Sequence, residues 1–429
     1  MKPLRSAAPG ARSRAPRSLP PPVHLDAAEG ADLLGELSGA PGVLLWGALR
    51  DFMLWVETPA GTRGGLFAPG AGELRRRELA AHAPDPELWA PLLTLAQMAD
   101  APERADCARL VYAVRAIARW AERAGAPATR LAFTRAAALA LPQEPGLALE
   151  AGRLARDLGR APEGEAWLRN AVRRARGTNW ETYVWAFIGL GVLYVRSGNY
   201  LGAQTVFGRA LRSARKRRLR SLEGSSLHHL FTCAAESHDI ARAYGYALAA
   251  LAAYGPGHAR IPALANDLAR LWMHLERCDR ALPVFAALMP LLTDPVERMI
   301  GEVNLARAAA GCGNRTVYER ARAEALERMA AVPAGTRVAE AWALVASADA
   351  AAGEWERMEE AAQRAFELAN ERGEAEARVM ADAQLEAACN RIPSPTEHWA
   401  DETAASAAEG GRLAGELIVR MREMEPVGA

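Results

Sequence analysis

Residues that bind soft metals gather at one place in this chain of 429 residues. His228, His229, Cys233 and His238 lie close together, and His229 and Cys233 are four residues apart, so that on a helix they would share a face. Imidazole and thiolate are ligands that zinc prefers. Two further ligands at suitable spacing are missing, so a buried cysteine beside an interface histidine is the favoured interpretation. We expect no metal and no cofactor.

The motifs of common catalytic sites are absent from the sequence. There is no H-E-x-x-H, no G-x-x-x-x-G-K, no G-x-S-x-G and no G-x-G-x-x-G after a strand. Gly311-Cys312-Gly313 could be read as a redox site, but a turn with a small residue explains it equally well. We therefore expect a protein that is not an enzyme.

Charge is balanced over the whole chain but concentrated in one run. Fifty-two basic residues face 51 acidic ones, which favours neither nucleic acid nor a membrane as partner. Seven of twelve consecutive residues are basic in one segment: Arg209, Arg212, Arg215, Lys216, Arg217, Arg218 and Arg220. A solvated face at a helix C-terminus is the favoured interpretation. The alternative, from another class of function, is a nucleic-acid-associated protein that uses this run to hold phosphates, although no aromatic residue lies within it for stacking.

Composition and periodicity indicate an all-α protein. Half the residues are hydrophobic, while aromatic residues make up 6%, and small residues in excess suit close helix packing. The five cysteines are widely spaced, which is typical of reduced thiols in a cytoplasmic protein. No apolar run reaches the roughly 18 residues of a membrane span. We therefore expect a cytoplasmic protein without a membrane span.

The stretch from Val184 to Arg217 has the pattern of two helices joined by a tight turn. Large and small residues recur at helical spacing on both sides of Gly198, where glycine takes the left-handed conformation cheaply. Gly191 and Ala203 would let the two helices cross closely. The residues of the pattern are Phe187, Leu190, Gly191, Tyr194, Gly198, Tyr200, Ala203, Phe207 and Ala210.

This pattern resembles the tetratricopeptide repeat, with Phe187 where the motif usually has Trp and Arg215 where it usually has Pro. Similar turns recur at a mean spacing of 38 residues, and the sixth could equally lie at Gly311: they are Gly125, Gly159, Gly198, His238, Glu276, Gly313 and Gly353. The longer spacings are similar to those of looser bacterial members of the family. The resemblance covers about residues 110–385 and implies a right-handed α-solenoid.

In that family the first helix of each pair lines a concave groove. The matching positions here are Arg115, Arg119, Arg123, Arg153, Arg156, Trp185, Val192, Arg196, His228, Asn266, Arg270, His274, Arg307 and Ser347. At the ninth position of the first helix, four of the seven repeats have arginine, namely Arg119, Arg153, Arg270 and Arg307. This predicts a row of guanidinium groups for an acidic segment or a terminal carboxylate. Pairing of these arginines with neighbouring acids on a solvated face is one alternative, and an apolar partner beside Trp185 and Val192 is another.

The resemblance therefore implies a non-catalytic scaffold that binds a protein or peptide partner. Within the same family, the alternative is a regulatory or sensor module that acts through a separate output chain. We expect a disordered basic tail (residues 1–25), a helical capping region (26–100), a solenoid of about seven repeats (101–390), and a linker with a C-terminal helix (391–429).

The two ends of the chain carry expectations of their own. Periodic apolar residues from Leu45 to Val56 predict a helix, which is followed by a loop over residues 58–72 or, alternatively, by a strand pairing there. Trp46 and Trp55 are expected to cover the first repeat rather than to form a partner surface. Near the C-terminus, Gly410-Gly411 should interrupt the helical pattern before an amphipathic helix over residues 412–424, which acts as a cap or, alternatively, as a partner helix.

Overall fold

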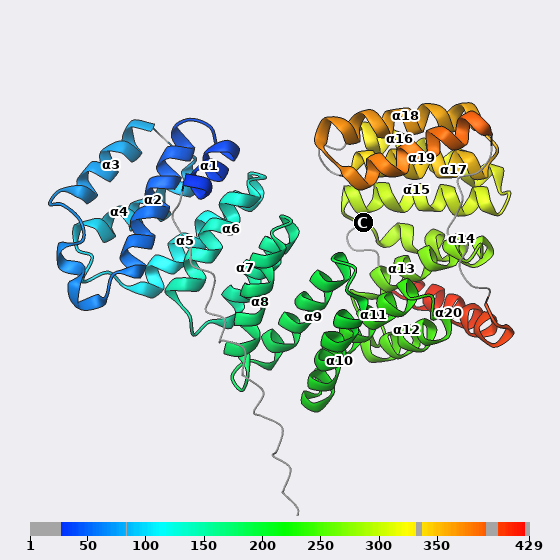
Figure 1. Ribbon diagram of the computed structural model, residues 1–429, viewed down its shortest axis with the longest axis horizontal. Helices are drawn as coiled ribbons and strands as arrows, with labels where there is room; N and C mark the ends of the chain where they lie inside the picture. Colours follow the sequence, from blue (N-terminus) through cyan, green and yellow to red (C-terminus); the bar gives the residue numbers. More distant parts are fainter. Residues whose placement is uncertain (1–26, 83, 332–336, 392–401, 425–429) are drawn as a thin grey trace, which may run out of the picture. The chain divides into compact units, whose positions relative to one another are not determined.

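The computed structural model describes residues 27–82, 84–331, 337–391 and 402–424. Within these ranges it contains twenty α-helices, two short 3-10 helices and no strand, which confirms the all-α fold (Figure 1). None of the helices in these ranges is both long enough and apolar enough for a membrane crossing. The expected basic tail at residues 1–25 lies outside the described residues.

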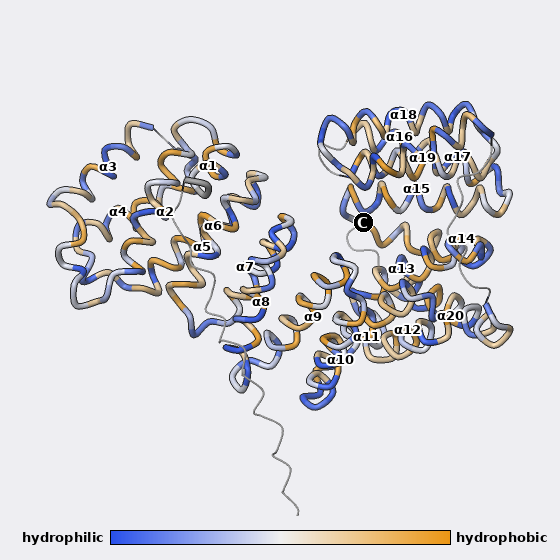
Figure 2. The backbone as a smooth tube through the Cα atoms, in the orientation of Figure 1, coloured by the Kyte–Doolittle hydropathy of each residue, from blue (hydrophilic) through white to orange (hydrophobic). Residues whose placement is uncertain are grey.

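Contacts divide the chain into two compact units, of which the first ends at Arg217 and the second begins at Arg218. Each unit is a solenoid of antiparallel helix pairs, in which every pair packs against the next one along the chain. Hydrophobic residues are interspersed with hydrophilic ones along the helices (Figure 2). Many helices bury one face against their neighbours, whereas α11 (Arg220–Glu236) and α15 (Pro295–Gly311) are buried over most of their surface.

Unit 1 begins with two helices, α1 and α2, that both contact α6, and α2 also contacts α4. Its helices are α1 (Ala27–Glu36), α2 (Ala40–Glu57), η1 (Ala60–Gly65), α3 (Ala71–His82), α4 (Pro86–Asp100), α5 (Cys107–Arg123), α6 (Pro127–Ala140), α7 (Pro145–Asp157), α8 (Ala161–Ala175), α9 (Trp180–Arg196) and α10 (Tyr200–Arg217).

Unit 2 contains four helix pairs, a single further helix, and a last helix that folds back. Its helices are α11 (Arg220–Glu236), α12 (Ile240–Tyr254), α13 (Ile261–His274), α14 (Cys278–Leu288), η2 (Met289–Leu291), α15 (Pro295–Gly311), α16 (Arg315–Ala331), α17 (Val338–Ala351), α18 (Trp355–Arg372), α19 (Ala375–Asn390) and α20 (Ala404–Arg422). The first helices of successive pairs contact one another from α11 through α19 and so form one continuous row.

The seven turns expected from the sequence all lie between the two helices of a pair. Each turn residue has a positive φ, from 56° at His238 to 77° at Gly353. The sixth turn is at Gly313, with φ 70°, whereas Gly311 is still part of α15. Glycine adopts this left-handed conformation without a steric penalty, which is why glycine marks most of these turns.

The close crossing of α9 and α10 depends on Gly191. A Cβ atom at this position would overlap the ring of Phe207, and both Phe207 and Ala203 are buried. A side chain here would therefore push the two helices of the pair apart.

We expect Gly191→Ala to lower the free energy of unfolding by about 1–3 kcal/mol, because overpacking of a rigid aromatic contact forces the backbone to move. Gly146→Ala in α7 is the matched control, since no other atom lies within 4 Å of the position that its Cβ would take. Urea unfolding of the full chain, followed by circular dichroism, compares the two variants. Equal midpoints would contradict the packing role of Gly191.

The region before the repeats differs from one expectation. The segment after α2 forms the 3-10 helix η1, so the alternative of a strand pairing there is wrong. Trp55 is 2% exposed, and its indole N–H donates a hydrogen bond of 2.7 Å to the carbonyl oxygen of Pro102. The Trp46 ring lies against Gly30 of α1. Both indoles are thus packed against other residues of unit 1.

The expectation that Gly410 and Gly411 interrupt the helical pattern near the C-terminus is wrong. Helix α20 continues through both glycines. A Cβ atom at Gly410 would approach Arg280 at 2.8 Å and Tyr244 at 3.1 Å, so this glycine lets α20 pack closely. The helix folds back against α12, α13 and α14 in the middle of unit 2 (Figure 1). Ile392-Pro393-Ser394-Pro395, which the sequence predicts to end the preceding helix, lies outside the described residues.

Candidate functional site

The groove positions of unit 1 are largely engaged by neighbouring side chains. The guanidinium of Arg156 makes two hydrogen bonds to Asp157, of 3.0 and 3.2 Å, and Arg196 lies 3.3 Å from the same carboxylate. Arg153 lies over the ring of Trp185, 4.7 Å from its centroid. Arg156 and Arg196 thus pair with a neighbouring acid, which is the alternative to binding an acidic partner.

The remaining positions of unit 1 are less crowded. Arg119 lies 5.7 Å from the centroid of the Tyr112 ring, and Arg123 pairs with Glu87. Arg115 is exposed, and no carboxylate of the described residues is within ion-pair distance of it. Val192 is half-buried on α9. The cavity described below in unit 1 is lined by none of these residues.

In unit 2 the expected positions converge on one cavity of about 810 Å³. It opens along the row of first helices, and its lining includes every expected groove residue from α13, α15 and α17: Asn266, Arg270, His274, Arg307 and Ser347. The N-terminal turn of α19 closes the far side with Glu376 and Ala377. A volume of this size accommodates several residues of an extended peptide.

Two guanidinium groups in this cavity lack an acidic partner. Arg307 is partly buried and donates a hydrogen bond of 3.2 Å to the side-chain oxygen of Asn304. No carboxylate of the described residues lies within ion-pair distance of Arg307 or Arg270. Burial, together with the nearby charge of Arg270, lowers the pKa of Arg307 to about 10. A partly desolvated cation that repels its neighbour is costly unless an anion joins it.

Two acidic groups of the cavity, Asp267 and Glu340, are paired within the protein. The ring of His228 is buried, and its Nε2 lies 2.9 Å from Asp267. Burial opposes ionisation of Asp267, but His228 and Arg270 lower its pKa on balance. Arg337 binds both carboxylate oxygens of Glu340 at 2.7 Å. His228 therefore supports the cavity wall. Arg270 on α13 interacts with the charge of Asp267, whereas Arg307 on α15 has no carboxylate among the causes of its pKa shift.

Sequence reasoning missed several residues of this cavity. Asp267 follows the expected Asn266, and Asn304 precedes Arg307 by one helical turn, so both lie next to positions that were identified. The N-terminal turn of α19 was not connected with the groove at all. Helical spacing of three or four residues from each expected position would have found Asn304, whereas the α19 residues required the fold.

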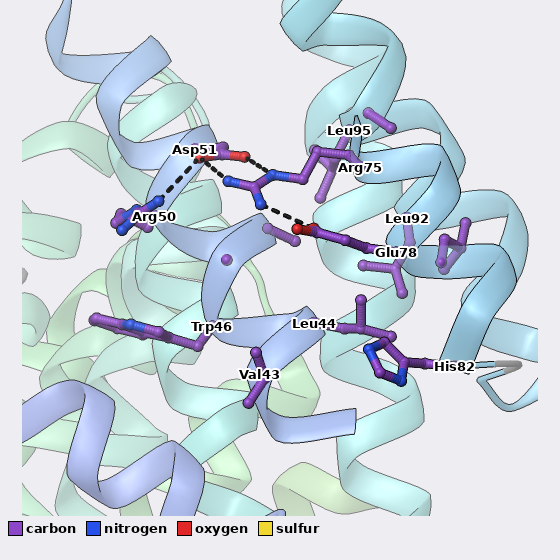
Figure 3. A pocket seen from close by; sticks show the side chains of 14 residues that line it. Val43, Leu44, Trp46, Arg50, Asp51, Arg75, Glu78, His82, Leu92 and Leu95 are labelled. Carbon is purple, nitrogen blue, oxygen red and sulfur yellow. Dashed lines mark hydrogen bonds and ion pairs between the residues drawn. The ribbon is translucent and has the colours of Figure 1, made fainter. Parts of the chain in front are cut away.

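A smaller cavity of about 260 Å³ lies in unit 1 between α2, α3 and α4 (Figure 3). Its charged groups satisfy one another: Arg75 donates to Asp51 at 2.8 and 3.3 Å and to Glu78 at 2.9 Å. These contacts raise the pKa of Arg75. Around them lie Val43, Leu44 and Leu92. Because Arg75 is already paired with Asp51 and Glu78, no charge needs a ligand here, unlike Arg307 in the cavity of unit 2.

The histidine–cysteine cluster has a different arrangement from a metal site. Within the described ranges, no group of three or more His, Cys, Asp and Glu side chains is placed to hold a metal ion. Cys233 is fully buried, and burial raises the pKa of its thiol to about 12, which opposes the thiolate form that metals bind. His228 is directed to Asp267 instead.

No protein-family model and no curated protein matches the sequence. Among solved structures, the chain is similar to BtubC from P. vanneervenii (19% identity, covering 52% of this chain and 91% of that chain, TM-score 0.39). It is also similar to the TPR2AB domain of yeast Sti1 in complex with an Hsp90 peptide (14%, 66% and 99%, TM-score 0.25) and to aspartyl phosphate phosphatase F from Bacillus subtilis (9%, 86% and 98%, TM-score 0.35). At these TM-scores the matches carry no argument about function. The resemblance to the tetratricopeptide repeat therefore rests on the sequence motif and on the helix pairs.

Proposed function

We propose that this protein is a non-catalytic helical-repeat scaffold that binds a segment of a partner protein in the cavity of unit 2. The observation that carries the proposal is the pair Arg270 and Arg307, which face a cavity of about 810 Å³ without an acidic partner among the described residues. An Asp or Glu side chain, or a terminal carboxylate, would form charge-assisted hydrogen bonds with these guanidinium groups. Bound there, it would also compensate the partly buried charge of Arg307.

The opposite wall restricts the partner further. Glu374 and Glu376 line the cavity at the start of α19, so a long acidic tract would be repelled on that side. The segment that fits best has one acidic group for α13 and α15, with a neutral or basic residue beside it.

Selection of random peptides against the immobilised full chain tests the proposal. Selected peptides should be enriched in Asp or Glu, and Arg307→Met should weaken the best of them by about 10- to 100-fold, as expected for loss of hydrogen bonds to a charged group. The thermal stability of this variant should stay equal or rise, because a costly buried cation is removed. Arg115→Met is the matched control and should bind normally. Peptides without acidic residues, or binding that is indifferent to Arg307→Met, would rule out this site.

A further inference from the structure

One end of unit 1 has an excess of positive charge that the balanced total conceals. Residues 166–217 contain ten basic residues and a single acidic one, Glu181. Helix α10 has five basic residues and no acidic residue along its length. A segment of this composition repels itself, so its arrangement in the fold decides whether the charges disperse or gather.

The fold places part of this positive charge around one aromatic side chain, Trp180. Helix α8 ends at Ala175 and α9 begins at Trp180, so only a short link separates the two. The guanidinium of Arg217, the last residue of α10, lies over the Trp180 ring at 3.9 Å from its centroid. The last turn of α10 therefore lies at Trp180, five residues after the end of α8. We call the exposed basic residues of α10 and of the end of α8 the basic end; they are Arg173, Arg176, Arg209, Arg212, Lys216 and Arg217.

The cations of the basic end are not neutralised by the protein. All six members of the basic end are exposed, and none lies within ion-pair distance of a carboxylate among the described residues. Arg217 stacks on the Trp180 ring instead. Other exposed arginines of unit 1 do have acidic partners, as Arg77 has Glu73 and Arg123 has Glu87. Next to the basic end, burial and the charge of Arg173 lower the pKa of Arg174.

The surroundings indicate what kind of anion fits. Among the described residues, no exposed large hydrophobic side chain belongs to α8, and on α10 the exposed one is Leu201, at the opposite end of the helix from Arg217. A protein interface usually has an apolar centre, and a membrane-binding helix inserts an apolar face. Interfaces with nucleic acid, in contrast, are dominated by positive charge.

The geometry of the basic end favours contact with the backbone of a nucleic acid over contact with its bases. Arg209, Arg212 and Lys216 share one face of α10 and extend about 10 Å along its axis, which is roughly three nucleotides of one DNA strand. Arg217 covers one face of the Trp180 ring, so that face is not open for base stacking, and the Tyr183 ring packs against Trp180 in a T-shaped contact at 5.2 Å. We propose that the basic end binds the phosphodiester backbone of a nucleic acid without reading its sequence.

Fluorescence anisotropy of the full chain with labelled oligonucleotides of about 24 nucleotides tests this. The probes are single-stranded RNA, single-stranded DNA and duplex DNA, each in two unrelated sequences, so that the arms distinguish the kind of nucleic acid. With about four phosphate contacts, affinity for the duplex should fall about 150-fold between 50 and 200 mM salt. The triple variant Arg209→Gln, Arg212→Gln, Lys216→Gln should reduce the slope of log affinity against log salt by about 3.

The matched control is Arg77→Gln, Arg104→Gln, Arg115→Gln, which removes the same charge from exposed positions elsewhere in unit 1. It should bind like the unchanged protein, and Arg307→Met should also leave nucleic-acid binding intact, which separates this inference from the proposed function. Equal losses in both triple variants, or no binding of any probe at 50 mM salt, would overturn the proposal. A strong preference between the two sequences of a probe would also overturn it. So would a result in which the unchanged protein binds phosphatidylserine-containing vesicles and the first triple variant loses that binding but keeps its affinity for every nucleic acid.

Discussion

Replacing Asp349 with alanine should lower the free energy of unfolding of unit 2 by about 3–5 kcal/mol. The carboxylate is fully buried on α17 and joins this helix to α16. It accepts a hydrogen bond of 2.6 Å from the Tyr318 hydroxyl and two from Arg322, of 2.7 and 3.0 Å. Alanine would leave the largely buried Arg322 guanidinium without its anion, which costs more than the pair itself contributes.

Hydrogen exchange of the full chain, followed by mass spectrometry, measures this effect locally, because the two units need not unfold together. Amides of α16 and α17 should exchange at least 100-fold faster if exchange there requires unfolding of the unit. Tyr318→Phe should cost about 1 kcal/mol, since it removes one hydrogen bond. Glu367→Ala on the exposed face of α18 is the control and should change nothing. Unaltered protection in the Asp349→Ala variant would show that packing alone holds α16 to α17.

The repeat architecture was predictable because its signals are local. A turn between paired helices needs a residue with positive φ, and five of the seven turns use glycine. His238 and Glu276 were found by spacing alone, and they adopt φ values of 56° and 57°. Gly191 could likewise be connected with a close helix crossing, because the residues of the crossing lie within one helix pair.

Electrostatic pairing was not predictable in the same way. The sequence placed Arg270 and Arg307 on one face but could not say that both would lack an acid, whereas Arg156 and Arg196 share Asp157. Whether an arginine is paired depends on residues from neighbouring helices. The contact of Arg217 with Trp180 shows the same limit: the basic run has no aromatic residue of its own, and the fold brings one to it.

Glu402 is the clearest case, since nothing in the sequence around it marks a binding residue. Its side chain is 1% exposed and lies between Tyr244, Arg277 and Arg280 of the central helix pairs. Arg280 donates hydrogen bonds of 2.8 and 3.0 Å to the carboxylate, and Arg277 donates one of 3.2 Å. This carboxylate fixes the start of α20, while Leu413 and Leu417 supply buried apolar contacts further along the helix.

We expect Glu402→Gln to weaken the docking of α20 by about 2–4 kcal/mol, because several hydrogen bonds to charged donors are lost. The effect should depend on pH. Burial alone would raise the pKa of Glu402, but Tyr244, Arg280 and Arg277 lower it on balance. The carboxylate therefore stabilises the docked helix above its unfolded pKa of about 4.3, and this contribution is lost as the pH falls through the lower pKa of the folded state.

Protection factors of the α20 amides, measured by hydrogen exchange between about pH 3 and pH 7, test both parts of this prediction. In the unchanged protein, protection should decline below about pH 4.3. In the Glu402→Gln variant it should already be about 30- to 1,000-fold lower at neutral pH and should decline less on acidification. Glu409→Gln, on the same helix, should behave like the unchanged protein. If α20 kept its full protection in the Glu402→Gln variant, then Leu413, Leu417 and Met421 would be sufficient to hold it, and the buried carboxylate would only select its register.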